Sequence, residues 1–156
     1  MTEELSKALE LLPHGPEFRF LDRLLSLAPG SSGAAEYLVR GDEPFLRGHF
    51  PDQPLFPGVL LLEAAAQLAG IVAQSDPGIP PMPGLKLTAL RAVKITGTAR
   101  PGELIRIEAT ITGRLSNLVQ AQVKAVLADH VILEGALTLS GEKHPNFLKE
   151  NSEKPT

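Results

Sequence analysis

The most apolar stretch of the chain is also its clearest helix. From about Gly58 to Gln74 nearly every position is aliphatic or alanine, and a helix that is apolar nearly all round is typical of a protein interior. One carboxylate, Glu63, stands inside this run, with Gln67 four residues further on. Side chains four apart share a helix face and can hydrogen-bond. Because an ionisable group is costly to bury among apolar residues, we expect Glu63 to have a partner or a chemical role.

The remainder of the chain is mostly patterned as strands. A short helix is predicted over residues 3–12, and Pro13 ends it. Strands are predicted over residues 18–27, 34–40, 85–95, 104–112, 116–127 and 131–140, where apolar positions recur and turn residues lie between. One buried helix and six mostly antiparallel strands place the chain in the α+β class, as a curved sheet wrapped around the helix.

The length and composition fit one domain. At 156 residues the chain can bury a sizeable core, and it shows no internal repeat. We assign residues 1–142 to this single domain. Residues 143–156 are polar, and we expect them to form a disordered C-terminal tail.

Several classes of chemistry and partner are disfavoured. The chain has no cysteine, so disulfides and thiolate chemistry are excluded. The formal net charge is -3 with both signs scattered, which argues against nucleic acid as a partner. No His and carboxylate cluster has metal-ligand spacing, so no metal is predicted. The apolar run is too short to span a bilayer, and the polar start of the chain is unlike a signal peptide, so we expect a cytoplasmic protein.

A proline-rich segment leads into the long helix. Pro51, Pro54 and Pro57 follow His49 at a spacing of three, and each proline keeps the residue before it extended. This stiff segment can hold His49 at a fixed place. Pro57 suits a helix start, and Gly58 after it leaves the first backbone N–H groups open to a ligand at the positive end of the helix dipole.

Together these residues resemble an acid–base site. Histidine exchanges protons near neutral pH and can act as a base. A base at His49, an acid at Glu63 and N–H donors at the helix start suit elimination of water from a 3-hydroxyacyl compound. His14 lies in a proline-flanked turn and His130 in a predicted hairpin turn, so we expect structural or solvated roles for both.

Three motifs resemble the hot-dog-fold 3-hydroxyacyl-acyl-carrier-protein dehydratases of FabZ type. L-L-P-H-G-P-E-F-R-F-L-D-R-L (11–24) is similar to the opening of that family. G-H-F-P-D-Q-P-L-F-P-G-V-L-L-L-E-A-A-A-Q (48–67) is nearly a complete copy of its active-site block. R-P-G-E-L-I-R-I-E (100–108) is similar to one of its strands. The resemblance implies a hot-dog fold for the sheet and helix described above.

The resemblance also implies a reaction. It makes the protein a hydro-lyase that removes water from (3R)-3-hydroxyacyl thioesters to give trans-2-enoyl thioesters, in fatty acid or related acyl-chain biosynthesis. His49 and Glu63 become the catalytic pair, with Gln67 supporting Glu63. The substrate-binding residues assigned on this basis, including an oxyanion donor at the helix start, are Phe50, Pro57, Gly58 and Val59.

The same family relationship implies partners. In the family, two subunits build each site, so we expect a homodimer, with a trimer of dimers as a further assembly. The acyl chain would be carried by acyl carrier protein or coenzyme A, and no cofactor is expected beyond the phosphopantetheine arm of the substrate. We also expect the segment from Ala89 to Thr98 to form the wall that sets the depth of the acyl tunnel.

Two other functions remain open at this stage. A hot-dog acyl thioesterase would use the carboxylate to hydrolyse the thioester. A non-catalytic acyl-binding hot-dog module would retain only the fold. Residues 91–102 depart from the basic, aromatic segment usual in the family, and this difference keeps the binding module as an alternative.

Overall fold

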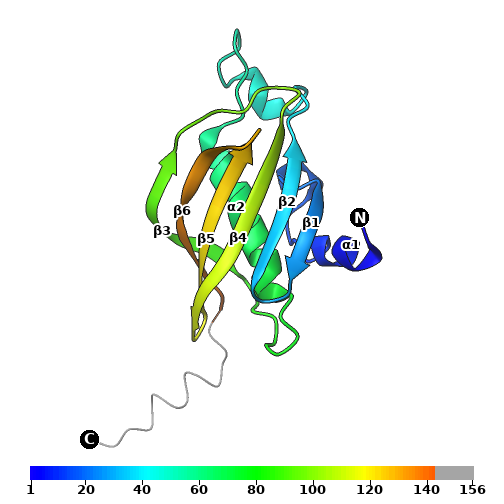
Figure 1. The fold of residues 1–156 in the computed structure, drawn as a ribbon, viewed down its shortest axis with the longest axis vertical. Helices are drawn as coiled ribbons and strands as arrows, with labels where there is room; N and C mark the ends of the chain where they lie inside the picture. Colours follow the sequence, from blue (N-terminus) through cyan, green and yellow to red (C-terminus); the bar gives the residue numbers. More distant parts are fainter. Residues whose placement is uncertain (143–156) are drawn as a thin grey trace, which may run out of the picture.

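One long helix and a six-stranded sheet make up the computed structural model, which describes residues 1–142 (Figure 1). The helices are α1 (Glu3–Leu9) and α2 (Gly58–Gln74), with short 3₁₀ helices at Pro16–Phe18 and Pro44–Arg47. The strands are β1 (Arg23–Ala28), β2 (Ser32–Leu38), β3 (Lys86–Ile95), β4 (Leu104–Leu115), β5 (Leu118–Leu127) and β6 (His130–Ser140). The predicted tail, residues 143–156, lies outside the described residues.

The strands form one antiparallel sheet in the order β1-β2-β4-β5-β6-β3. Figure 1 shows the sheet in front and α2 behind it, with α1 beside β1 at one edge. The predicted α+β architecture, a curved six-stranded sheet around one long helix, is confirmed. The edges of the sheet are β1 and β3, and β3 reaches its place beside β6 through the crossover that contains α2.

The core lies between α2 and the middle of the sheet. The helix packs on β2, β4, β5 and β6, and its small residues let it approach closely. Ala65, Leu61, Leu68, Ala69 and Val72 are all fully buried. Truncating a buried leucine such as Leu68 to alanine costs about 2–5 kcal/mol, because the lost methyl groups leave a cavity.

The first predicted strand is partly wrong. Pairing with β2 begins only at Arg23, and residues 16–18 form a 3₁₀ turn instead. The stretch between them is extended, and Asp22 N–H already donates to the Glu36 carbonyl of β2. Phe20 N–H instead donates to the side chain of Gln67 on α2. The other predicted strands are confirmed, with ends that shift by a few residues.

An aromatic cluster ties this extended stretch to the loop that precedes α2. Phe20 packs edge-on against Tyr37, Phe45 and Phe56, with ring centroids 5.9–6.1 Å apart. Phe20 and Phe56 are almost completely buried. Such edge-to-face pairs add about 0.5–1.5 kcal/mol beyond burial, so the cluster fixes the end of the proline-rich segment, at Phe56, against the sheet.

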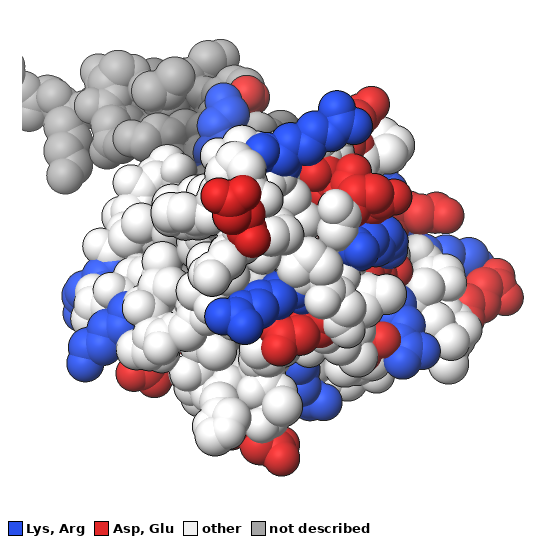
Figure 2. Space-filling view, turned by 90° about the horizontal axis from the view of Figure 1, so that it is seen from above, with Lys and Arg blue, Asp and Glu red and all other residues white. Residues whose placement is uncertain are grey.

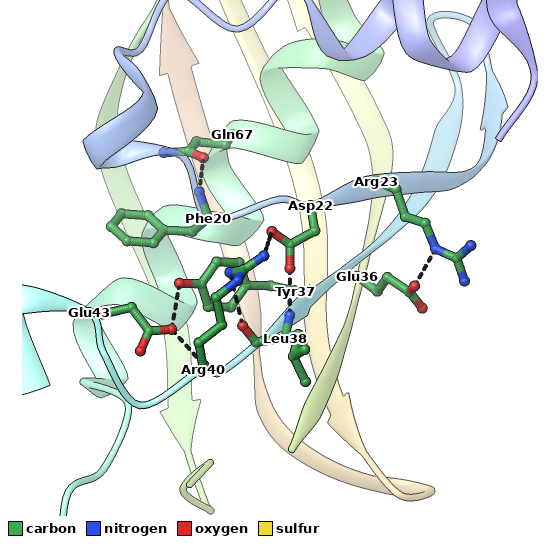
Figure 3. Close-up of polar contacts among 9 residues, drawn as sticks. All are labelled: Phe20, Asp22, Arg23, Glu36, Tyr37, Leu38, Arg40, Glu43 and Gln67. Atoms are coloured by element: carbon green, nitrogen blue, oxygen red, sulfur yellow. Dashed lines mark hydrogen bonds and ion pairs between the residues drawn. The ribbon is translucent and has the colours of Figure 1, made fainter. Parts of the chain in front are cut away.

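A buried carboxylate holds the same loop (Figure 3). Glu43 accepts hydrogen bonds from the Tyr37 hydroxyl at 3.0 Å and from the N–H groups of Arg40 and Gly41 at 2.8 and 2.7 Å. Burial opposes ionisation, but these donors together hold the pKa of Glu43 below its ordinary value. Burial, followed by the bond to Glu43, raises the pKa of Tyr37. The turn after β2 is therefore fixed by an ionised carboxylate.

Strand β3 differs from the interior strands in its exposure. Most of its residues are exposed, including Leu90 at 50% and Ile95 at 46%. Only one side of β3 is paired, by β6. An edge with free backbone groups and apolar side chains is a template for pairing with another chain.

Candidate active site

His49 lies in the loop before α2 with its ring held in one orientation. Its Nδ1 is 2.8 Å from the carbonyl oxygen of Leu55, and a carbonyl can only accept, so Nδ1 carries the proton. The ring of Phe50 packs edge-on against it at 4.6 Å. This tautomer leaves Nε2 with a free lone pair, which is the arrangement that a general base needs.

The backbone beside His49 is strained. Phe50 has a φ of 58°, a left-handed conformation that is uncommon for a bulky residue and costs on the order of 1–3 kcal/mol. Its side chain is 59% exposed. A turn closed by Gln53 N–H on the Phe50 carbonyl stabilises this conformation. Strain of this kind gathers at functional sites.

The start of α2 offers free backbone donors. Pro57 is buried, and its carbonyl accepts from the N–H groups of Leu60 and Leu61. Within residues 1–142 this leaves the N–H groups of Gly58 and Val59 for a ligand, at the positive end of the helix. A Cβ at Gly58 would stand 3.1 Å from Ile95 Cδ1, so glycine also lets α2 lie close to β3.

Glu63 and Gln67 lie one and two turns further along the helix. Gln67 is almost fully buried, at 2% exposure. Its Oε1 accepts from Phe20 N–H at 3.0 Å, and its Nε2 donates to the Phe18 carbonyl at 2.8 Å and to Glu63 Oε1 at 3.2 Å. The two backbone partners settle which way the amide faces. Gln67 thus donates a hydrogen bond to Glu63, and its supporting role in catalysis stays a prediction.

His14 is the residue that the sequence interpretation missed. Its Nε2 lies 3.3 Å from Glu63 Oε1, although the sequence pointed to a structural turn residue. The turn that carries it is held by Arg19, whose Nε donates to the His14 carbonyl at 2.8 Å. Sequence spacing could not show this contact, because residues 14 and 63 meet only when residues 12–20 fold over α2. The L-P-H motif was the available signal.

A cavity of about 750 Å³ opens beside Glu63. It follows one face of α2 from Glu63 past Gln67 and Gly70 to Gln74, and Leu85 and Leu139 are among the apolar residues opposite. His14 is at its polar end. Among the described residues, none from 89–98 lines this cavity. The prediction that residues 89–98 form its wall is therefore wrong for this cavity, and the segment just before and at the start of β3 lines it instead.

The predicted site residues fall into two groups within one protomer. His49, Phe50, Pro57, Gly58 and Val59 surround the start of α2, and Glu63 and Gln67 line the cavity with His14. In the described part of the chain no contact joins His49 to Glu63, and His49 does not line the cavity. The pairing of these two residues across a subunit boundary stays a prediction.

Charge and metal binding add little to this picture. Seen from above, Lys and Arg are interspersed with Asp and Glu, without a large field of one sign (Figure 2). Residues 1–142 hold no group of three or more His, Asp or Glu side chains placed to bind a metal ion. No helix in that range is long and apolar enough to cross a membrane.

The chain matches known sequences over most of its length. Residues 12–136 match the family described as FabA-like domain. A relative from Chloroflexus aggregans, named 3-hydroxyacyl-(acyl-carrier-protein) dehydratase FabZ, is 32% identical over 135 residues, covering 85% of this chain and 92% of the relative. A protein of the same name from Ruminiclostridium cellulolyticum is 36% identical over 140 residues, covering 86% and 94%.

Solved structures share the fold at lower identity. The dehydratase heterocomplex ApeI:P from Xenorhabdus doucetiae aligns with a TM-score of 0.74 at 17% identity, over 94% of this chain and 97% of that chain. Zebra fish thioesterase superfamily member 2 aligns with a TM-score of 0.66 at 16% identity, over 87% and 94%. These likenesses confirm the hot-dog fold. Because the fold carries both activities, function has to be argued from the site.

Proposed function

Because this chain belongs to the FabA-like domain family, we propose that it is a hydro-lyase that removes water from (3R)-3-hydroxyacyl thioesters and forms trans-2-enoyl thioesters. The observation that carries the proposal is the state of His49, whose Nδ1 donates to the Leu55 carbonyl and whose Nε2 is free to accept a proton. The FabZ relatives, matched over most of their length, support the same reaction.

The base and the oxyanion donors act at the start of α2. His49 Nε2 takes the proton from the carbon next to the thioester carbonyl. The electron pair released by that C–H bond moves toward the carbonyl oxygen. The N–H groups of Gly58 and Val59 donate hydrogen bonds to this oxygen and stabilise its enolate-like negative charge. Because these groups all lie at the start of α2, the base and the oxyanion donors keep fixed positions relative to each other.

The acid completes the elimination. Glu63 donates its proton to the hydroxyl on the third carbon as that C–O bond breaks, and water leaves while the double bond forms. The proton gained by His49 then returns to Glu63 through solvent or product water, which restores both groups. We expect the reaction to need no cofactor other than the phosphopantetheine arm that carries the acyl chain.

The cavity gives the acyl chain a place to lie. Its lining is mainly apolar, and it starts at Glu63. The rise along α2 from Glu63 to Gln74 is about 16 Å. An extended chain of about 14 carbons has this length, because each bond of about 1.5 Å advances the zigzag by about 1.3 Å. Gln74 marks the far end, where its side chain both donates to and accepts from the backbone of Met82.

The complete site is proposed to need two chains. His49 and Glu63 do not meet within the described protomer, and β3 presents an unpaired, partly apolar edge. Antiparallel pairing of β3 with the same strand of a second copy would join the sheets and bring each His49 toward the partner subunit's Glu63. A homodimer, or a trimer of such dimers, is therefore the proposed working form, in the cytoplasm.

The reaction is tested with a hydroxyacyl substrate on acyl carrier protein and on coenzyme A. We expect the wild-type protein to form the enoyl thioester, followed by its ultraviolet absorbance, with a preference for acyl carrier protein. His49→Ala and Glu63→Gln should each lower kcat by about 10²–10⁴-fold, as removal of a general base or acid does. Thiol release without enoyl product would assign a thioesterase instead, and activity retained in both variants would refute the assignment.

A further inference from the structure

Glu63 is held through one oxygen only. Gln67 Nε2 lies 3.2 Å from Oε1, and His14 Nε2 lies 3.3 Å from the same atom. Among residues 1–142, Oε2 has no hydrogen-bond or ion-pair partner, and Glu63 lines the cavity. The carboxyl group therefore has a protein side and a cavity side.

The donor groups on the protein side are themselves fixed. Gln67 cannot turn its amide without breaking its bonds to the backbone at Phe18 and Phe20. The His14 ring stacks on Phe18, with centroids 6.0 Å apart and planes 29° from parallel. The Arg19 guanidinium holds the carbonyl of His14. Both groups that contact Glu63 are thus held in place by residues 12–20, the segment that folds over α2.

The surroundings of His14 select its protonation. Its Nδ1 is buried and has no hydrogen-bond partner among the described residues. A proton on Nδ1 would be a buried donor without an acceptor, which is costly. A lone pair on Nε2 would face the lone pairs of Glu63 Oε1. The neutral ring with its proton on Nε2 avoids both conflicts, so His14 presents an N–H to Glu63.

We propose that His14 is a positioning residue that acts with Gln67 to keep Oε1 of Glu63 as the acceptor and so present the acidic proton on Oε2 toward the substrate. A carboxyl group that faces N–H groups with one oxygen carries its proton on the other. Without His14 the carboxyl group of Glu63 can rotate, so that either oxygen faces Gln67. In part of the molecules the acidic proton then points away from the substrate. This inference rests on the proposed dehydratase function.

The test compares two replacements of His14. His14→Phe keeps a ring to stack on Phe18 but removes the N–H, and His14→Gln keeps an N–H donor at similar reach. We expect kcat to fall by about 10- to 100-fold in His14→Phe, as small misplacement of a reacting group does, with little change in KM. His14→Gln should recover most of the loss. His130→Phe, at an exposed histidine outside the site, is the matched control and should leave kcat unchanged.

The split between kcat and KM, together with the rescue by His14→Gln, separates positioning from a structural effect. A merely structural role would not be restored by an N–H donor in place of the ring. Lys86, the other charged residue that lines the cavity, is exposed and is unchanged in both variants. Thermal melts of each variant check that the fold is kept.

The outcomes for the two proposals are distinct. Absence of enoyl formation by the wild-type protein overturns the dehydratase function itself. An active wild type with an unchanged kcat in His14→Phe overturns the role of His14 alone. Equal losses in His14→Phe and His14→Gln, or a rise in KM without a change in kcat, also overturn it, because they indicate packing or contact with the acyl chain.

Discussion

Replacing Gln67 by methionine should destabilise the protein far more than the same change at Gln74. Both glutamines lie on α2, seven residues apart, and both bond to backbone groups of another segment. Methionine preserves the length and most of the volume of glutamine and removes its polar atoms. The two variants therefore differ in what they leave behind.

The magnitude follows from burial. Gln67 is 2% exposed, and its bond to Phe20 N–H is buried. Without it, that N–H loses its only acceptor, which costs about 1–3 kcal/mol. The bond to the partly buried Phe18 carbonyl adds about 1 kcal/mol, so the expected total is about 2–4 kcal/mol. Gln74 and Met82 are partly exposed, and water can replace the lost bonds, so the change there should cost less than about 1.5 kcal/mol.

Urea unfolding at pH 7, followed by circular dichroism, measures both values. With a slope of about 2 kcal/mol per molar urea, Gln67→Met should lower the midpoint by about 1–2 M. All proteins must be compared at one protein concentration, because a dimer gains stability with concentration. The slope should stay constant, which shows that the same surface is exposed on unfolding.

Equal destabilisation by the two variants would refute this reasoning. It would mean that the buried bonds of Gln67 are no more valuable than solvent-accessible ones. A loss below about 1 kcal/mol for Gln67→Met would have the same meaning, because the Phe20 N–H would then have found another acceptor at little cost.

Three further changes probe the loop, the cavity and the sheet edge. Because the pKa of Glu43 is lowered in the fold, its contribution to stability is complete above its unfolded pKa of about 4.3 and is lost as the pH falls through the lower folded pKa. Glu43→Gln should therefore be less stable at pH 7 by about 1–3 kcal/mol. It should also lose less stability than the wild type on acidification, as measured by urea midpoints at pH 7 and at about pH 3. At Gly70 a Cβ would lie 4.0 Å from Leu85 and Leu139, so Gly70→Leu should fill the cavity and lower kcat/KM for long acyl chains while sparing four-carbon ones. Leu90→Asp, on the exposed edge of β3, should convert a dimer to a monomer in light scattering; a dimer that persists would place the interface elsewhere.

The helix and most strands could be predicted because their signals are local. The apolar run of α2 and the period-two alternation of β4 and β5 specify burial by themselves. The segment 18–22 was predicted as a strand on the same signal, and there the prediction failed. Only its last residue bonds to a strand, through Asp22 N–H and the Glu36 carbonyl of β2, whereas Phe20 N–H donates to the side chain of Gln67. Local periodicity cannot predict a bond to a side chain that is distant in sequence.

The sequence by itself determined the chemistry available to this protein: a histidine on a proline-stiffened loop, a helix start free of side chains at glycine, and a carboxylate supported from four residues away on the same helix. These relations span a few residues, so backbone geometry settles them. Only the tertiary structure brought His14 to Glu63 and kept His49 away from it within the protomer. Both results depend on how segments distant in sequence pack over α2, because long-range contacts are decided by burial of the whole core.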